Sequence, residues 1–319
     1  MAVGTARMSL KICYMSRISH LLFLLWCLTP MQGIAQLRVA TYQYAGNSRE
    51  NNIRPAANVV AAAIGQTAKV ASYAGVRELV DAIQRDEVDL AFINTFGYLL
   101  LAADSAAATG MPPLVVWQPP TGGVGDNYRC IFIAPQGGLI ADSADIVRYA
   151  SELSLLLVSE GSTSGNLVPR MALSALGIAY PEQQFKTVVY GGTHQAAAGQ
   201  VAMGKADLGA IGSIAYADFV RDTTNRPIRL VWKSPEIPLG PVLVSSRFSD
   251  PEREQMAAAF TNLHRSHPAA FEAAKQGWSE AQHVQTYQRV PADYLDRLMP
   301  QFGDIAELKR ILAKFLTGG

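Results

Sequence analysis

The sequence predicts an α/β protein made of two lobes. Short strands that are apolar along almost their whole length, such as residues 88–93, alternate with helical segments, which indicates parallel sheets covered on both faces. This alternation occurs twice along the chain. Two extended segments, at residues 128–133 and 229–235, separate the two runs and are interpreted as crossovers between the lobes. A chain of 319 residues, 49% of them hydrophobic, is long enough for two domains.

The first 35 residues have the character of a secretory signal peptide. Lys11 and Arg17 precede a short apolar run at residues 21–28, and small residues then lead to Ala35, after which we expect cleavage. The apolar run is too short for an ordinary membrane anchor, so no stable membrane insertion is expected. The pattern therefore predicts an exported protein that works in the periplasm.

The first lobe is predicted to comprise residues 36–128 and 235–319. Its strands are expected at 37–42, 67–72, 88–93, 112–118 and 241–246. Its helices are expected at 55–64, 76–85, 96–103, 250–267, 268–276 and 292–316.

The second lobe is predicted to comprise residues 129–234 and to repeat the same alternation. Its strands are expected at 154–159, 186–190 and 206–211, with helices near 145–152, up to residue 177 and at 195–203. Open α/β sheets bind ligands beyond the carboxyl ends of their strands. Two such lobes that face each other therefore define one ligand cleft.

A turn rich in glycine and hydroxyl residues connects the strand at 154–159 to the helix that ends before Gly177. The first N–H groups of a helix lack partners within the helix, and the helix dipole adds partial positive charge, so this turn suits an oxyanion. Its hydroxyl groups would add donors. The alternative is that these hydroxyls only cap the helix. The turn reads Gly161-Ser162-Thr163-Ser164-Gly165.

The turn lacks the features of two common enzyme motifs. A phosphate-binding loop of nucleotide hydrolases requires Gly-Lys-Ser/Thr, and no lysine follows these glycines. A nucleophile elbow requires serine at the centre of Gly-x-Ser-x-Gly, where this chain has Thr163. A hydrolase using Thr163 or Ser162 with His194 is the alternative from a different class, but no acidic residue is evident to orient His194. We therefore expect a protein that is not an enzyme and needs no cofactor.

The charge distribution gives no indication of a nucleic-acid partner. The formal net charge is +1, and the basic residues are dispersed along the chain. Any anionic ligand must then be held by a local site.

Three groups of residues together resemble the periplasmic proteins that bind phosphate, phosphite and phosphonate, the PhnD-like proteins. The match runs in one order over most of the chain after the predicted signal peptide. The resemblance implies a type II periplasmic-binding-protein fold, with two Rossmann-like lobes joined by two crossover strands. It also implies a role in supplying ABC importers or periplasmic sensing domains. The matching residues are Gly161–Gly165 with Leu167-Val168-Pro169, Gly191-Gly192-Thr193-His194 with Ala206-Asp207-Leu208-Gly209-Ala210, and Trp232-Lys233-Ser234-Pro235 with Ile237-Pro238.

The resemblance also implies positions for the ligand-binding side chains, and these agree with helix N-termini that face each other from opposite lobes. The alternative for the tyrosine is packing, and for the histidine a helix cap. The positions are Tyr73 for a cleft tyrosine, Asn94 or Thr95 for the first-lobe contact, Ser162, Thr163 and Ser164 for a hydroxyl cradle, and His194 for a cleft histidine.

One departure from the family pattern concerns the ligand's charge. Relatives that bind aminoalkyl phosphonates have acidic residues beside the ligand's ammonium group, one of them in the turn after Ile-Pro. Here that turn reads Leu239-Gly240-Pro241, and the strand after Asp207 leads into Gly212-Ser213 and not into an acid. We therefore expect a ligand without an ammonium group and favour a small inorganic oxyanion.

A second departure is Cys130, which stands on the first crossover where a small hydroxyl residue is usual. It is the only cysteine outside the predicted signal peptide. Exported proteins that report arsenite to a sensor histidine kinase resemble the same family and rely on one cysteine, and arsenic favours soft sulfur ligands. Cys130 is therefore either an arsenic ligand at the cleft or a small buried residue. No metal site other than this arsenic site is expected.

These observations predict a periplasmic solute-binding protein that captures one small oxyanion between two lobes. The candidates are phosphate, phosphite, phosphonate and an arsenic oxyanion. The protein is expected to be a monomer and to present its ligand to an ABC permease or to the periplasmic domain of a sensor histidine kinase. Arsenite sensing through Cys130 is the main alternative.

Overall fold

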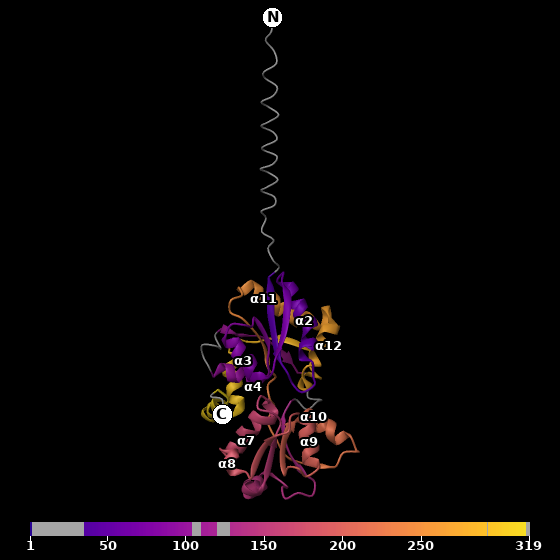
Figure 1. The fold of residues 1–319 in the computed structure, drawn as a ribbon, viewed down its shortest axis with the longest axis vertical. Coiled ribbons are helices and arrows are strands. Elements are labelled where there is room, and N and C mark those ends of the chain that lie inside the picture. The colour runs from indigo at the N-terminus through magenta and orange to yellow at the C-terminus, as the bar shows by residue number, and fades with distance from the viewer. Residues whose placement is uncertain (2–34, 104–109, 120–127, 292, 317–319) are drawn as a thin grey trace. The chain divides into compact units, whose positions relative to one another are not determined.

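The described residues form an α/β structure with two sheets. The computed structural model describes Met1 and residues 35–103, 110–119, 128–291 and 293–316, so the predicted signal peptide lies almost wholly outside the described residues. Each sheet is flanked by helices (Figure 1). We call the part built on the six-stranded sheet the first lobe and the part built on the five-stranded sheet the second lobe. This arrangement confirms the predicted α/β class.

The sheet of the first lobe has a parallel half and an antiparallel half. β1 lies between β2 and β3 and runs parallel to both, with Val39 opposite Val70 and Leu90. β10 runs antiparallel to β3 and β4, and β11 runs antiparallel to β4. The strand order is β11 (Thr286–Arg289), β4 (Pro113–Gln118), β10 (Pro241–Val244), β3 (Leu90–Phe92), β1 (Gln36–Tyr42) and β2 (Thr67–Tyr73).

Helices cover both faces of this sheet because successive residues of a strand point to opposite faces. Leu37 and Val39 belong to the core beneath α2, α11 and α12, whereas Ala40 belongs to the core beneath α3 and α4. The helices of this lobe are α2 (Arg49–Ala63), α3 (Val76–Gln84), α4 (Thr95–Ala102), α11 (Asp250–Ser266), α12 (Pro268–Lys275), α13 (Tyr294–Leu298) and α14 (Ile305–Leu316), with the short 3₁₀ turns η3 (Ser279–Ala281) and η4 (Met299–Phe302).

The second lobe repeats this plan around a smaller sheet. Leu155 and Leu157 of the interior strand β6 face one core, and Leu156 faces another. The strand order is β7 (Thr187–Tyr190), β6 (Ser154–Leu157), β8 (Leu208–Gly212), β5 (Cys130–Pro135) and β9 (Ile228–Lys233). The helices are α6 (Ser143–Tyr149), α7 (Val168–Ala175), α8 (Pro181–Gln184), α9 (His194–Ala202) and α10 (Ser213–Arg221), with the 3₁₀ turn η1 (Ala150–Glu152) and the π-helical turn η2 (Thr163–Leu167).

The chain changes sheets twice. It passes from β4 in the first sheet to β5 in the second and returns from β9 to β10. β5 lies between β8 and β9 and runs antiparallel to both, with Cys130 opposite Gly212. The predicted lobe boundaries at residues 128–129 and 234–235 stay predictions.

Several elements differ from the sequence-based expectation. Helix α2 begins at Arg49 and not at residue 55, so that Pro55 lies inside the helix although proline usually marks a helix start. The single helix expected at 292–316 is divided into α13, η4 and α14, and Gly303 adopts φ +86° immediately before the last of them. A positive φ ends a right-handed helix. The strand β11 was not expected, because its sequence TYQR is short and polar.

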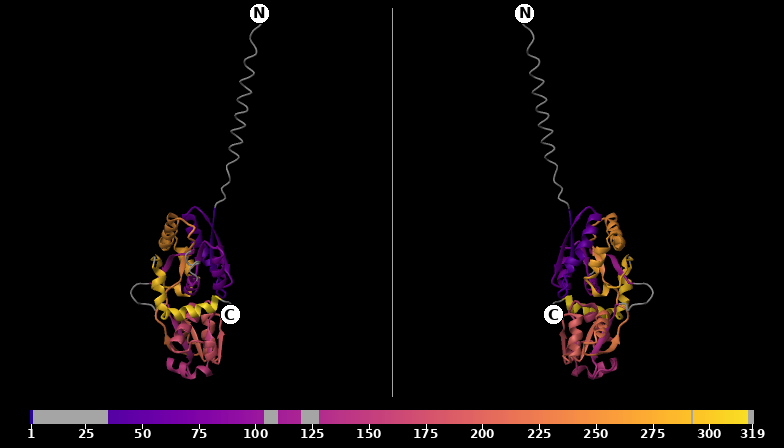
Figure 2. Two further views of the ribbon diagram at one scale, coloured as in Figure 1. Left: turned by 90° about the vertical axis from the view of Figure 1, so that its left-hand side faces the viewer. Right: turned by 90° about the vertical axis from the view of Figure 1, so that its right-hand side faces the viewer.

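The C-terminal helix α14 contacts both lobes. A terminal nitrogen of Arg310 donates a hydrogen bond of 2.7 Å to the carbonyl oxygen of Ala179 in the second lobe, and its guanidinium lies 4.6 Å from the ring centroid of Tyr180. In the first lobe, Phe315 packs against Phe96 of α4, with ring centroids 5.2 Å apart. Figure 2 shows this helix, in yellow, between the indigo and magenta parts of the fold. Although it was assigned to the first lobe, α14 therefore joins the two.

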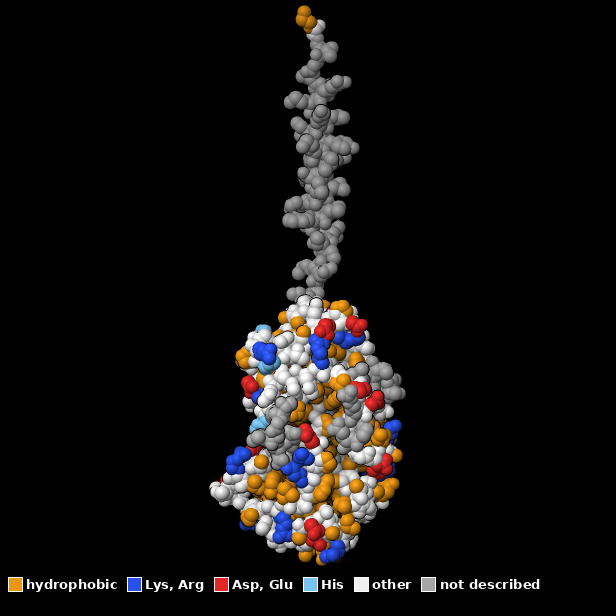
Figure 3. All heavy atoms as spheres, turned by 180° about the vertical axis from the view of Figure 1, so that it is seen from behind, with side chains coloured by type: hydrophobic (Ala, Val, Ile, Leu, Met, Phe, Trp, Pro, Cys, Tyr) orange, Lys and Arg blue, Asp and Glu red, His pale blue; other side chains and the backbone are white. Residues whose placement is uncertain are grey.

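The described surface has no extended stripe of one charge on the face shown in Figure 3. Lys and Arg side chains alternate there with Asp and Glu. Among the described residues, none of the helices has the length and apolar character needed to cross a bilayer.

The role of α14 in joining the lobes is testable through its buried face. Leu312 is 1% exposed and belongs to a core that contains residues of both sheets. We expect Leu312→Ala to lower the free energy of unfolding by about 3 kcal/mol, within the usual range for a buried leucine. Urea denaturation followed by circular dichroism measures this change. The exposed Lys309→Ala on the same helix is the control and should change stability by less than about 0.5 kcal/mol. Equal effects of the two substitutions would contradict the packing of α14.

Candidate functional site

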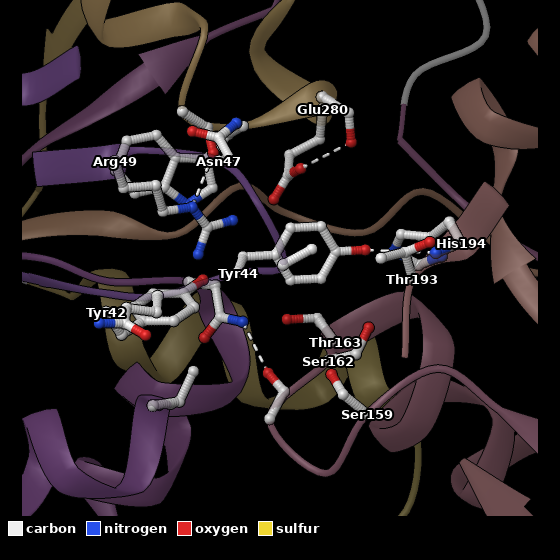
Figure 4. Close-up of a pocket in the computed structure, with 18 of the residues that line it drawn as sticks. Tyr42, Tyr44, Asn47, Arg49, Ser159, Ser162, Thr163, Thr193, His194 and Glu280 are labelled. Atoms are coloured by element: carbon white, nitrogen blue, oxygen red, sulfur yellow. Dashed lines mark hydrogen bonds between the residues drawn. The ribbon is translucent and has the colours of Figure 1, made fainter. Parts of the chain in front are cut away.

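A cavity of about 580 Å³ is lined by segments of both lobes. From the first lobe come the segment after β1, the start of α3, Asn94 and the chain between α12 and η3. From the second lobe come the turn after β6 and the start of α9. Except for the chain between α12 and η3, these segments follow the carboxyl ends of parallel strands, where open α/β sheets bind ligands. Figure 4 shows side chains from both lobes converging on this space.

The hydroxyl turn after β6 forms the N-terminus of η2. Ser162 caps it by accepting a hydrogen bond of 3.0 Å from the Gly165 N–H. Thr163 Oγ1 accepts a hydrogen bond of 3.1 Å from the N–H of Phe96 in the other lobe. Ser162 and Thr163 line the cavity. A hydroxyl that accepts a hydrogen bond still carries its own proton, so each of these groups keeps a donor for a ligand.

Ser164 lies one step further from the cavity. It is fully buried, and its Oγ lies 2.7 Å from the hydroxyl of Tyr128, which donates to it. Tyr128 itself lines the cavity, on the segment that leads into β5. Ser164 therefore orients a cavity-lining tyrosine, a relation that the sequence pattern did not reveal.

Asn94 connects the two lobes at the edge of the cavity. Its side-chain oxygen caps α4 by accepting a hydrogen bond of 2.9 Å from Gly97 N–H, while its Nδ2 donates one of 2.8 Å to the Gly161 carbonyl. Gly161 is required here, because a Cβ atom at this position would lie 2.8 Å from a methyl group of Val76. Thr95, the other candidate at this helix start, is directed elsewhere and donates to the Pro238 carbonyl at 2.5 Å.

His194 presents a neutral ring to the cavity. Its Nδ1 accepts a hydrogen bond of 3.0 Å from the Gly212 N–H, which places the ring proton on Nε2. The side chain is 8% exposed, and burial lowers its pKa from 6.5 to about 4. Near neutral pH His194 therefore offers one N–H donor and no charge. Its backbone N–H donates to the Tyr44 hydroxyl of the other lobe at 3.3 Å.

Four of the eight candidate residues line the cavity: Asn94, Ser162, Thr163 and His194. Tyr73, at the end of β2, is not among the lining residues, and its hydroxyl lies 3.5 Å from Glu87. Cys130 is not among them either. Its thiol is fully buried on β5, and burial raises its pKa.

Among the lining residues that the sequence pattern did not single out are Tyr42, Tyr44, Arg49, Trp278 and Glu280. Burial raises the pKa of Tyr44 to about 12 and also raises the pKa of the Glu280 carboxyl. Glu280 is notable because this sequence has no acid in the turn after Ile237-Pro238 or after the strand that follows Asp207, the two positions considered for an acid that faces the ligand. The sequence did offer one indication for Tyr42, Tyr44 and Arg49. They lie at or shortly after the end of the parallel strand β1, and ligand-binding residues collect at such strand ends. Trp278 and Glu280 had no such signal, because they are distant in sequence.

Comparisons with known proteins agree with this architecture. No curated protein is significantly similar to this chain. A Xanthomonas citri protein solved with bound chloride has a TM-score of 0.68 and 18% identity, covering 86% of this chain and 98% of its own. PhnD1 from Prochlorococcus marinus, solved with methylphosphonate, has a TM-score of 0.63 and 17% identity over 88% of this chain and 98% of its own.

A third neighbour is the binding-protein component of an ABC phosphonate transporter from Pseudomonas aeruginosa. Its TM-score is 0.62 with 16% identity, over 89% of this chain and 100% of its own. At these identities the likeness concerns the fold, and it confirms the two-lobe type II periplasmic-binding-protein architecture.

A family model described as the periplasmic substrate-binding protein of phosphonate ABC transporters matches residues 41–290, which is most of the chain. Members of this family are periplasmic, bind small ligands and work with an ABC permease. The order of the glycine and hydroxyl motifs, the two-lobe fold and this match lead to the same conclusion. The chain belongs to the family of phosphonate-binding periplasmic proteins of ABC transporters.

Proposed function

We propose that this protein binds a phosphonate or a related small oxyanion in the cavity between its lobes and delivers it to an ABC permease. The observation that carries this proposal is the convergence of the hydroxyl turn, Asn94 and His194 on one cavity. Family membership supports it, and so does the methylphosphonate bound to the Prochlorococcus marinus neighbour. Of the eight candidate residues named from the sequence, the proposal relies on Asn94, Ser162, Thr163 and His194, which line the cavity.

The donors at this site suit an oxyanion without any chemical step. The N-terminus of η2 and the hydroxyls of Ser162 and Thr163 supply hydrogen bonds to a negative charge. The Nε2–H of His194 supplies another. In this tautomer Nε2 carries the proton and cannot act as a base toward Thr163, which argues against a hydrolase.

Lobe closure is the proposed means of ligand capture. The hydrogen bonds from Asn94 to Gly161 and from Phe96 to Thr163 already connect the lobes beside the cavity. A ligand that contacts both lobes adds to these bonds and shifts the population toward the closed form. Delivery to a permease would require the same bonds to break.

The arsenite-sensing alternative has no structural support. It requires the Cys130 thiol at the cavity, and this thiol is 0% exposed on a central strand of the second sheet. Transport is therefore favoured over arsenite sensing.

Isothermal titration calorimetry of the purified protein tests the proposed function. We expect methylphosphonate, phosphite or phosphate to bind, and Thr163→Ala to weaken binding about ten- to a hundredfold. Loss of a hydrogen bond to a charged group costs about 1.5–3 kcal/mol, and each 1.4 kcal/mol is about tenfold in affinity. The exposed Thr187→Ala on β7 removes the same hydroxyl away from the cavity and should leave affinity unchanged. Absence of binding for all three oxyanions would refute the proposal.

The imidazole of His194 should report the bound anion. Its pKa of about 4 in the free protein results from burial, and an adjacent negative charge favours the protonated ring. We therefore expect saturation with methylphosphonate to raise this pKa, as measured by NMR titration of the ring protons. The ring protons of the exposed His267 are the internal control, and methylphosphonate should leave their NMR signals in place. An unchanged His194 pKa in the saturated protein would place the anion elsewhere.

The same depressed pKa predicts how stability depends on pH. The unfolded chain binds a proton to His194 near pH 6.5, before the folded chain does near pH 4. The contribution of the neutral His194 ring to the free energy of unfolding is therefore fully present above pH 6.5 and is lost between pH 6.5 and 4. The loss is about 3 kcal/mol, at about 1.4 kcal/mol per pH unit. His194→Gln should lack this part of the slope in urea denaturation, whereas His267→Gln should keep it. Identical slopes in all three proteins would mean that His194 is not buried as described.

The burial of Cys130 predicts low thiol reactivity. We expect a chromogenic disulfide reagent to react with this thiol in urea and not in the native protein, because the thiolate is the reactive form and burial disfavours it. Cys130→Ser supplies the baseline from the other cysteines. Rapid native reaction that disappears in Cys130→Ser would contradict the buried position and restore the arsenite hypothesis.

A further inference from the structure

Arg49 is a buried cation at the first-lobe end of the cavity. It is the first residue of α2 and is 5% exposed. Its guanidinium carbon lies 4.3 Å from the ring centroid of Tyr42, 5.1 Å from that of Tyr44 and 4.7 Å from that of Trp278. Figure 4 shows the guanidinium projecting into the cavity beside the two tyrosines. Three aromatic rings therefore fix its position.

One nitrogen of this guanidinium has no partner. Arg49 Nε donates a hydrogen bond of 2.7 Å to the Gly277 carbonyl, but its Nη1 is buried without any hydrogen bond within the described part of the chain. A buried donor without a partner is costly, and one on a charged group more so. An acceptor that enters the cavity would satisfy it. Arg170 Nη1 and Arg129 Nε are also buried without a hydrogen bond, but of these three arginines only Arg49 lines the cavity, so only Arg49 can meet a group that enters it.

The neighbouring charges leave Arg49 as the attractive centre for an anion. Lys275 and Glu272 also line the cavity, and they pair with each other at 3.1 Å. Glu280 accepts a hydrogen bond from Ser279 at 3.4 Å. Burial raises the pKa of its carboxyl, and the nearby charge of Arg49 offsets part of that rise.

The size of the cavity indicates an organic ligand. Its volume is about 580 Å³, whereas one water molecule takes about 30 Å³ in the liquid. An inorganic oxyanion has the volume of only a few waters and leaves most of this space unfilled. A ligand with an organic chain fills more of it and can contact both the hydroxyl turn and Arg49, which line the same cavity.

We propose that the ligand is an organic oxyanion with two acidic ends, a phosphonate or similar head at the hydroxyl turn and a carboxylate that pairs with Arg49. This inference rests on the proposed function and specifies its ligand class. An ammonium group is disfavoured at Arg49 because the cation already occupies the aromatic faces that would otherwise attract it. A carboxylate matches the planar fork of a guanidinium, which binds it through two parallel hydrogen bonds.

Calorimetry with four probes tests this ligand class: methylphosphonate, phosphonoacetate, 3-phosphonopropionate and 2-aminoethylphosphonate. We expect at least one of the two phosphonocarboxylates to bind about tenfold or more tightly than methylphosphonate. Arg49→Met should abolish this advantage, measured as the ratio of the two affinities. The control Arg54→Met removes the same charge from the same helix, at a side chain that is 43% exposed and paired with Glu50. It should leave the ratio as in the unmodified protein.

Because Arg49 packs among aromatic rings, a second variant guards against misfolding. Arg49→Lys keeps the charge and the stem but loses the planar fork, so it should retain the thermal unfolding transition and lose most of the carboxylate advantage.

The outcomes separate this inference from the proposed function. Binding of methylphosphonate without any advantage for the carboxylates would overturn the inference and leave the proposed function standing. Tighter binding of 2-aminoethylphosphonate that is lost in Glu280→Gln would also overturn it, by assigning this end of the cavity to an ammonium group. Absence of binding for every probe would refute both.

Discussion

The site depends on the contact between two helix N-termini from different lobes. Asn94 caps α4 and at the same time donates to Gly161, while Thr163 at the start of η2 accepts from the first turn of α4. Each helix N-terminus therefore forms a hydrogen bond with the segment that begins the other helix. Helix N-termini carry partial positive charge, and bringing two of them together is unfavourable without compensating acceptors. The side-chain and carbonyl oxygens provide these acceptors, and a bound anion would complete the compensation.

The close approach of the lobes has a steric requirement at Gly161. A side chain there would collide with Val76 of α3, so the backbone of the hydroxyl turn can meet the first lobe only through glycine. The helix α14 supports the same contact from another side, by packing Phe315 against Phe96 of α4 and bonding Arg310 to the second lobe. The lobes are thus joined by the chain crossings from β4 to β5 and from β9 to β10, by the two helix N-termini, by the bond between His194 and Tyr44, and by α14.

Each lobe contains a buried arginine, and the two differ in how their charge is compensated. Arg170 is 4% exposed and pairs with Glu182 at 2.6 Å, so its charge is balanced within the protein. Arg49 is equally buried but meets aromatic faces and a carbonyl, and it forms no salt bridge within the described residues. Nη1 of both arginines is buried without a hydrogen bond, so the unpaired nitrogen does not separate them. Burying a charge without a paired counter-ion lowers stability unless something else compensates. The missing salt bridge, together with its place in the lining of the cavity, distinguishes Arg49 from Arg170.

The sequence by itself determined the alternating α/β plan, the two lobes and the hydroxyl turn, because hydrophobic periodicity and turn residues are local properties. It also brought Asn94, Ser162, Thr163 and His194 forward as candidates. Only the tertiary structure showed that Ser164 bonds to Tyr128, that Cys130 is buried between β8 and β9, and that Tyr73 lies beside Glu87. It alone brought Trp278 and Glu280 next to Arg49. The contacts of Arg49 with Trp278 and Glu280 join residues more than two hundred positions apart in the chain, and no local pattern encodes which side chains will meet when a sheet and its helices pack.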